Sequence, residues 1–168
     1  MVASSRVPKM NRFVSNTTLR LDSKGRVSIP APFRAVLGRD GFDGLYCYPA
    51  LDRPAIDAGG NALMSEIETV IARFAPFSEE REQFSAALYG TSATLKLDAE
   101  GRVTLNEPLK VHAGIADRVL FVWLGHKFQL WEPGRFQAEL AQATQKVRAL
   151  REQLKSQAAA PTAHGAWE

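Results

Sequence analysis

The chain contains few of the side chains that usually build metal, redox or catalytic sites. Its 168 residues include one cysteine, Cys47, and three histidines. A single cysteine cannot form an internal disulfide, and one that stands between two tyrosines is typical of a small buried apolar side chain. The histidines are isolated along the sequence, at His112, His126 and His164. No cluster has the ligand spacing of a zinc or other metal site, so we expect neither a metal nor a cofactor.

Long apolar segments are also missing. No run approaches the roughly 18–20 residues needed to span a bilayer. The first residues, MVASSRVPKMNRF, carry basic side chains but lack the apolar core of a secretory signal. The composition, 45% hydrophobic and 23% charged, is that of an ordinary soluble globular protein. We therefore expect a cytoplasmic protein with a sizeable core.

The chain has little excess charge of either sign. The formal net charge is +3, and residues 1–16 account for all of it, because they contain Arg6, Lys9 and Arg12 and no acid. The remaining residues hold 18 basic and 18 acidic side chains. Overall charge therefore does not predict nucleic-acid binding, which would have to depend on where individual charges lie.

An internal repeat is the most informative feature that the sequence does contain. Residues 19–38 and 95–114 align without a gap, and eight of the twenty aligned positions are identical. The identical pairs are Leu19/Leu95, Leu21/Leu97, Asp22/Asp98, Gly25/Gly101, Arg26/Arg102, Val27/Val103, Pro32/Pro108 and Gly38/Gly114. Chance would supply a few matches but would not place them at every turn and cap position. The repeat therefore indicates a duplicated structural unit.

Each copy predicts a basic hairpin followed by a short helix. Leucines that alternate with polar residues predict one strand, and the alternation after the turn predicts a second. The segments 22–25 and 98–101 predict tight turns, because Asp can bond its own backbone and Gly accepts a positive φ. Prolines in the first turn and glycines at the C-terminal cap mark the helices, at Pro32, Pro108, Gly38 and Gly114.

The rest of the chain predicts connecting helices and further strands. Strands are expected at 45–48, 119–124 and 128–131, with a weak counterpart near 55–56. Apolar residues from Leu63 to Phe74 have helical spacing, and Ser78 can cap a second helix that ends at Gly90. A heptad seam, Phe136, Leu140, Ala143, Val147, Leu150 and Leu154, predicts a long helix that packs on its own domain or on another subunit.

The predicted organisation follows from these elements. It comprises a basic extension (1–16), a first repeat (17–58), intervening helices (59–91), a second repeat (92–132), an amphipathic helix (133–157) and a disordered tail (158–168).

The two predicted hairpins differ in charge. Residues 19–29 hold three basic side chains and one acidic, whereas residues 95–105 hold two of each. A two-stranded ribbon fits the major groove of B-DNA, where Arg and Lys meet phosphates or guanine edges. The candidate DNA-binding residues are Arg20, Lys24, Arg26, Arg34, Lys96, Arg102 and Lys110. We expect the first hairpin to dominate binding, while the second is mainly structural or contacts DNA through Arg102 alone.

The motif aspartates also have purely structural interpretations. Asp22 and Asp98 can bind the backbone of their own turns, or pair with the arginine four positions on. The repeat by itself therefore indicates a duplicated fold and does not identify a ligand.

These residues resemble the MraZ family of bacterial transcriptional regulators, which are built from two SpoVT/AbrB-type swapped-hairpin repeats. The resemblance covers about residues 10–132 and includes LDSKGRVSIPAPFR at 21–34, LYGTSATLKLDAEGRVTL at 88–105, HAGI at 112–115 and KFQLWE at 127–132. The combination is specific, because a generic AbrB-type protein has a single copy. There are two departures: residues 1–9 precede the usual start at Met10, and residues 49–60 lack the apolar strand residues usual there.

The resemblance implies an α+β fold in which the repeats interleave into one double-split β-barrel. It implies a ring-shaped homo-oligomer that presents basic hairpins to tandem repeats of double-stranded DNA in a promoter region. Similar proteins regulate the division and cell-wall gene cluster that encodes them, which implies a cytoplasmic, nucleoid-associated location. The family's motifs fall on Asp22/Arg26 and Asp98/Arg102. Its DNA-contacting arginine falls on Arg26, and the basic residue of the following helix on Arg34, with Lys110 in the second copy.

An enzyme and a non-catalytic scaffold are the two alternatives to a DNA-binding regulator. An enzyme is not expected, because the sequence has no Ser/His/Asp grouping, no phosphate-binding glycine loop and no metal cluster. Asp22 and Asp98 lie beside arginines that would keep them ionised and unsuited to proton transfer. The alternative is a non-catalytic scaffold that oligomerises through its heptad helix. DNA binding would weaken steeply with salt, whereas such a scaffold would bind no DNA.

Overall fold

The computed structural model describes residues 16–159, which divide into two compact units at Pro133. The first unit contains, in chain order, β1 (Thr17–Arg20), β2 (Arg26–Ser28), α1 (Ala31–Arg39), β3 (Leu45–Pro49), β4 (Ile56–Gly59), α2 (Asn61–Ile71), α3 (Glu79–Leu88), β5 (Ala93–Leu95), β6 (Arg102–Thr104), α4 (Glu107–Ala113), β7 (Arg118–Trp123) and β8 (Phe128–Trp131). The second unit begins at Gly134 and contains all but the first residue of α5 (Pro133–Ala159). Nearly all of the predicted basic extension and of the predicted disordered tail lies outside the described residues. Within residues 16–159, no helix is long and apolar enough to cross a membrane.

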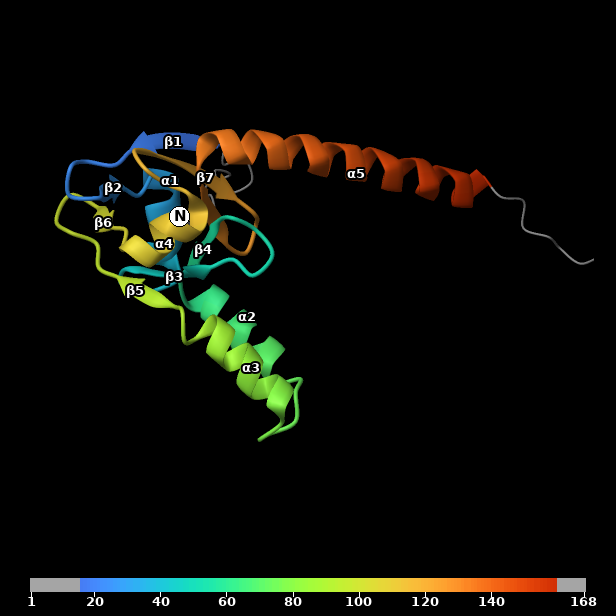
Figure 1. The fold of residues 1–168 in the computed structure, drawn as a ribbon, viewed down its shortest axis with the longest axis horizontal. Coiled ribbons are helices and arrows are strands. Elements are labelled where there is room, and N and C mark those ends of the chain that lie inside the picture. Colours follow the sequence, from blue (N-terminus) through green and yellow to red (C-terminus); the bar gives the residue numbers. More distant parts are fainter. Residues whose placement is uncertain (1–15, 160–168) are drawn as a thin grey trace, which may run out of the picture. The chain divides into compact units, whose positions relative to one another are not determined.

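The strands of the two repeats interleave in antiparallel sheets (Figure 1). The larger sheet has the order β1-β7-β8-β4-β3-β5, and the smaller one pairs β2 with β6. β1 from the first repeat pairs with β7 from the second, and β5 from the second pairs with β3 from the first. The predicted α+β class is therefore confirmed. The expected closed barrel is not seen among the described strands, because β1 and β5 remain the edges of the larger sheet.

The two strands of each predicted hairpin do not form a ladder with each other. Beyond the turn at residues 22–25, β1 pairs with β7, whereas β2 pairs with β6 of the other repeat. Only the turn itself is closed, since the Asp22 N–H donates to the Arg26 carbonyl at 2.9 Å. The prediction of a self-paired hairpin is thus wrong beyond its turn. Crossing to the other repeat places Val27 opposite Val103, both 1% exposed, and so buries apolar surface that a lone hairpin would leave in water.

The main apolar core joins α1 and α4 to strands of both repeats. Phe33 of α1 is fully buried, and its ring centroid lies 5.0 Å from that of Phe128 and 5.9 Å from those of Phe121 and Trp123. Cys47 of β3 is also buried in this core, and burial raises the pKa of its thiol to about 12. The interpretation of Cys47 as a small buried apolar side chain is confirmed.

β4 is a central strand, although the sequence around it indicated only a weak strand. All four of its residues are buried, and it pairs with both β3 and β8. Its Asp57 accepts hydrogen bonds from Lys127 Nζ at 2.9 Å and from Gln129 Nε2 at 2.7 Å. Ile56 is the one large apolar residue of β4, and the hydrogen bonds of Asp57 link this strand of the first repeat to the second repeat.

The glycines at the ends of the short helices differ between the repeats. Gly114 caps α4 in the left-handed conformation, with φ 66°, as predicted. The prediction that Gly38 caps α1 is wrong, because the helix continues to Arg39 and is followed by Asp40. The left-handed residue after α1 is Gly41, with φ 72°. Gly38 lies inside the helix and does not adopt a positive φ.

The helices α2 and α3 form an antiparallel pair that extends from the sheet (Figure 1). The predicted cap of α3 is confirmed, since the Arg81 N–H donates to Ser78 Oγ at 3.2 Å. The rings of Phe74 and Phe84 stack with centroids 4.8 Å apart, which holds the two helices together near their connection. The connecting turn contains Phe77, whose side chain is 96% exposed.

The apolar seam of α5 is exposed from Leu140 onward. Leu140, Val147, Leu150 and Leu154 have exposed fractions between 45% and 65%. The predicted helix is confirmed and reaches Ala159.

Candidate nucleic-acid interface

The Asp22 turn is held by the aspartate itself. Asp22 Oδ1 accepts the backbone N–H groups of Lys24 and Arg26, each at 2.9 Å. Asp22 Oδ2 accepts the side-chain Nε–H of Arg26 at 2.6 Å. Gly25 completes the turn with φ 75°, where a side chain would be strained. The motif therefore fixes the direction in which the Arg26 guanidinium leaves the backbone.

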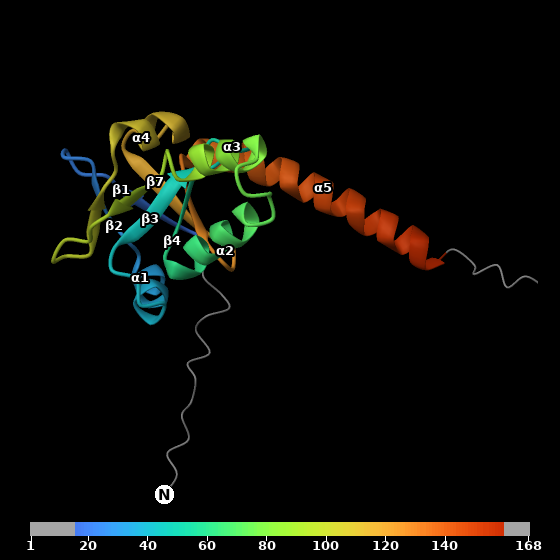
Figure 2. The same cartoon turned by 90° about the horizontal axis from the view of Figure 1, so that it is seen from below.

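The second copy repeats this geometry. Asp98 Oδ1 accepts the N–H groups of Glu100 and Arg102 at 2.9 Å, and its Oδ2 accepts Arg102 Nε–H at 2.9 Å. Gly101 has φ 76°. Both structural interpretations of the motif aspartates are confirmed. Each carboxylate binds the backbone of its own turn, and each also pairs with the arginine four positions on. Both turns project from the same end of the first unit (Figures 1 and 2).

The short ribbon of β2 and β6 joins the two turns. Arg26 lies opposite Thr104, and Arg102 lies opposite Ser28. The ladder continues beyond the strands, since the Ile29 N–H donates to the Gly101 carbonyl at 3.0 Å and the Leu105 N–H donates to the Gly25 carbonyl at 3.1 Å. The ribbon that carries both arginines thus contains one strand from each repeat.

The two motif arginines have different surroundings. The Arg26 Nε pairs with Asp22, while among the described residues no carboxylate pairs with its two Nη groups. All three nitrogens of Arg102 face carboxylates: Nε pairs with Asp98 at 2.9 Å, Nη2 with Glu100 at 3.1 Å, and Nη1 lies 3.9 Å from Asp22. Arg26 can therefore offer a forked pair of donors to an incoming anion, whereas Arg102 is already neutralised by its own protein.

The basic residues of the short helices lie against the turns of the opposite repeat. A Cβ added to Gly101 would lie 2.7 Å from Arg34 Nη1, and a Cβ added to Gly25 would lie 3.7 Å from Lys110 Nζ. Lys110 also forms an ion pair with Glu107. Sequence reasoning placed Arg34 after the first hairpin, but it missed this crossing because the alignment of the repeats shows each copy and not its partner.

The remaining candidate cations lie at the surface. Arg20, Lys24 and Lys96 are exposed, and within residues 16–159 none of them forms an ion pair. The structure adds Arg118, which is exposed and lies opposite Arg20 across β1 and β7. Like charges that face each other across strands are unfavourable unless an anion binds between them. In the sequence, the one sign of Arg118 is that it follows an aspartate directly before the predicted strand at 119–124.

Acid is expected to loosen both turns. The backbone N–H groups that bind Asp22 and Asp98 favour the ionised carboxylates and lower their pKa values. Because these pKa values are lowered on folding, the stabilisation is complete above the unfolded pKa of about 3.9 and is lost as pH falls further. Amide NMR signals of Arg26 and Arg102 should therefore be constant from pH 7 to 5 and shift below about pH 4.

A double variant, Asp22→Asn with Asp98→Asn, provides the control for this prediction. Its amide oxygens can still accept the backbone N–H groups, but they do not titrate. An unchanged acid response in this variant would show that the aspartates are not its source.

Among the described residues, no group of three His, Cys, Asp or Glu side chains is arranged to hold a metal ion.

Comparison with known proteins gives consistent matches. The family model described as "MraZ protein, putative antitoxin-like" matches residues 88–157. The chain is 61% identical over 152 residues to Transcriptional regulator MraZ of Xanthobacter autotrophicus, covering 90% of this chain and 97% of that protein. It is 63% identical over 147 residues to the protein of that name from Azorhizobium caulinodans, covering 88% and 94%. It is 57% identical over 164 residues to that from Beijerinckia indica, covering 95% and 100%, so the similarity spans both repeats.

Proposed function

The chain belongs to the MraZ family, and on this premise we propose that it is a transcriptional regulator that binds double-stranded DNA through its two motif turns. The observation that carries the proposal is the Arg26 guanidinium, which Asp22 orients through Nε, while no carboxylate within residues 16–159 pairs with its Nη groups. Its relatives bear the name of transcriptional regulators, which is not an enzyme class.

We propose that the β2–β6 ribbon enters the major groove. A two-stranded antiparallel ribbon has the width that this groove accepts. The Arg26 fork would bind a phosphate or the O6 and N7 atoms of guanine, and Lys24 beside it would bind the backbone. The other candidate cations, Arg20, Arg34, Lys96, Arg102 and Lys110, would position the ribbon by contacts to phosphates.

The two turns would contribute unequally. Glu100 occupies the Nη2 group of Arg102, and no acid stands at the equivalent position of the first turn, which is Lys24. The first turn would therefore read DNA, while the second would hold the ribbon and contribute less binding energy.

Removing the Glu100 charge is expected to strengthen DNA binding. Glu100→Gln frees one donor group of Arg102 and removes an acid from the interface, so affinity should rise about two- to tenfold. Fluorescence anisotropy titration at fixed salt would measure this. Glu68→Gln, which removes the same charge from exposed α2, is the matched control, and an equal gain there would indicate a general charge effect instead.

We further propose that the sites are tandem repeats in a promoter region and that several copies of the chain bind them as a ring-shaped homo-oligomer. Each turn can make only a few phosphate contacts, and linking copies raises the effective concentration of the others. The proposed target is the division and cell-wall gene cluster that encodes the protein, which would place it on the nucleoid. The proposed architecture is the double-split swapped-hairpin barrel, which the interleaved strand pairs support.

Footprinting on the DNA upstream of the protein's own gene tests the proposal. Protection should appear at regularly spaced repeats, and the affinity should fall with salt with a slope of about −0.9 per phosphate neutralised. Protection that is absent at every salt concentration would contradict the proposal.

A non-catalytic scaffold is the second candidate function. The exposed seam of α5 from Leu140 to Leu154 favours it, because such a seam packs on a partner helix. A scaffold of this kind would self-associate independently of DNA, and its assembly would be insensitive to Arg26→Ala.

A further inference from the structure

The turn between α2 and α3 displays a phenylalanine in an unfavourable conformation. Phe77 has φ 64° and is the one non-glycine residue with a positive φ in the described part of the chain. A bulky side chain rarely adopts this region. Its ring is 96% exposed, so the single chain gains no burial from it. Aromatic rings buried in a partner's pocket commonly anchor protein interfaces, and an exposed ring on a strained turn is suited to that role.

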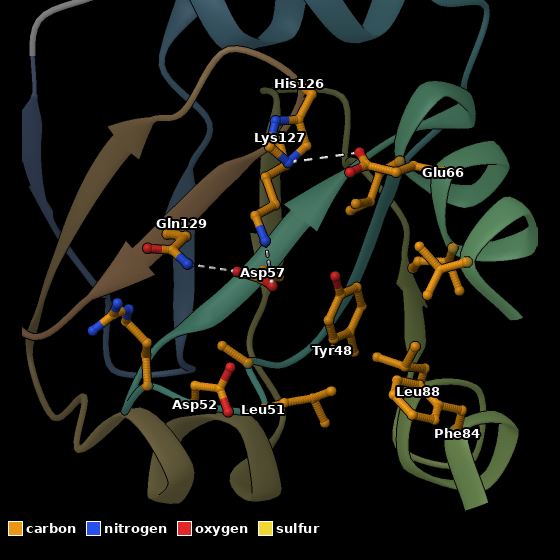
Figure 3. A pocket seen from close by; sticks show the side chains of 15 residues that line it. Tyr48, Leu51, Asp52, Asp57, Glu66, Phe84, Leu88, His126, Lys127 and Gln129 are labelled. Carbon is orange, nitrogen blue, oxygen red and sulfur yellow. Dashed lines mark hydrogen bonds and ion pairs between the residues drawn. The ribbon is translucent and has the colours of Figure 1, made fainter. Parts of the chain in front are cut away.

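A cavity of about 270 Å³ lies between the sheet and the same two helices (Figure 3). Its apolar wall consists of Leu63, Ile67, Val70, Phe84 and Leu88. Leu51, which is 54% exposed, adds an apolar residue to its lining from the loop after β3. Apolar cavities of about 150 Å³ already hold a benzene molecule, so a phenyl ring fits here.

The rest of the cavity lining is mostly polar, and several of its side chains are paired with one another. Figure 3 shows Lys127 and Gln129 directed at Asp57, with hydrogen bonds of 2.9 and 2.7 Å. His126 Nε2 lies 3.6 Å from Glu66 Oε2 on the same side. The apolar wall is therefore the part of the cavity that would gain most from an occupant, and an apolar ring suits it better than a charged group.

Phe77 is not among the residues that line the cavity of its own chain. The connection between α2 and α3, which contains this residue, lies at the end of the helix pair away from the sheet (Figure 1). The stacked rings of Phe74 and Phe84 hold this connection against α3. A Phe77 ring that occupies this cavity must therefore belong to a second copy of the chain.

We propose that Phe77 of one copy inserts into the cavity of a second copy. This inference rests on the proposed function, which includes self-assembly, and it specifies the residues through which two copies meet. A knob and a cavity at different places on one chain form a heterologous contact, which adds copies successively and closes into a ring when the rotation permits. The ring of Phe77 serves as the anchor, and Leu51 of the copy that supplies the cavity contacts the copy that supplies the ring.

Phe77→Asn tests the knob. Asn adopts the left-handed conformation readily, so the variant should fold at least as well as the unaltered chain. Its self-association should weaken at least about tenfold, as for a central anchor residue. Sedimentation velocity of the full chain would then show at least a halving of the weight-average mass. Val111→Asn, which replaces another exposed apolar residue, should leave the mass unchanged.

Leu51→Glu tests the cavity. The side chain is exposed, so the fold should tolerate the change, which circular dichroism would verify. The charge should oppose entry of the ring and lower the mass as much as Phe77→Asn does. An equal mixture of the two variants should form pairs, because one supplies the cavity and the other supplies Phe77.

Each departure from this pattern overturns the proposal. A Phe77→Asn chain with the original mass would show that the ring is not an anchor. A Leu51→Glu chain with the original mass would show that the cavity takes no part in self-association, so that it holds a small molecule or nothing. A mixture that forms no pairs would place Phe77 and Leu51 in different contacts.

DNA binding provides a separate readout. Both variants leave the motif turns intact, so each should bind a short duplex from the upstream DNA with the salt slope of the unaltered chain. If the unaltered chain failed to bind this duplex, the proposed function would fail, while the mass measurements would still decide the contact.

Discussion

Replacing Arg26 by alanine is expected to weaken DNA binding by about 10–100-fold, whereas Arg102→Ala should change it only about two- to threefold. The reason is the difference in their partners. Arg26 has one carboxylate on Nε and a free fork, while Arg102 has carboxylates facing all three nitrogens. Only Arg26 can thus give both donors to DNA without breaking an existing ion pair. Gel-shift titrations of both variants at one salt concentration would measure the difference.

Arg26→Lys separates charge from geometry. Lysine keeps the positive charge but has no fork, so its affinity should lie between those of the unaltered chain and the alanine variant. Both variants should keep the turn, because Asp22 still binds two backbone N–H groups. Equal losses for Arg26→Ala and Arg102→Ala would contradict the proposed asymmetry.

Replacing Phe33 by alanine is expected to lower the free energy of unfolding by about 3–5 kcal/mol. Phe33 is fully buried and contacts three aromatic rings from β7 and β8. The cavity left by its ring would lie where α1 meets the second repeat. A loss of this size is a large part of the roughly 5–15 kcal/mol that stabilises a domain. Urea denaturation would measure it.

Two further variants sharpen this result. Phe33→Leu keeps an apolar side chain of similar reach and should cost less than half as much as alanine. Ala35→Ser, on the exposed face of the same helix, should change stability by no more than about 0.5 kcal/mol. A loss below about 1 kcal/mol for Phe33→Ala would mean that α1 is not anchored by this ring.

Local features of the fold could be predicted from the sequence, because they depend on neighbouring residues. The turns at Asp22 and Asp98, the cap at Ser78 and the left-handed Gly114 each follow from one residue type at one position. The strand partners do not follow from local patterns, and only the family resemblance implied that the two repeats interleave. Nothing near Val27 indicates that its strand pairs with Val103 and not with β1.

The candidate site shows the same division. The sequence identified Arg26 and its aspartate, but their ion pair and the free fork depend on coordinates. The contact of Arg34 with Gly101 depends on the exchange of strands between repeats. Phe77 gave no signal at all, since its importance comes from a backbone angle and an exposed fraction.

The exchange of strands also constrains how the chain can fold during synthesis. Thr17 pairs with Phe121, about a hundred positions later, and β2 likewise cannot pair until β6 has been synthesised. While only the first repeat has left the ribosome, its β1 and β2 have no partners and expose unpaired backbone groups. Folding is therefore delayed until β7 has been made, and contacts of such long range are slow to form. A chain interrupted between the repeats would yield an aggregation-prone fragment and no half-active domain.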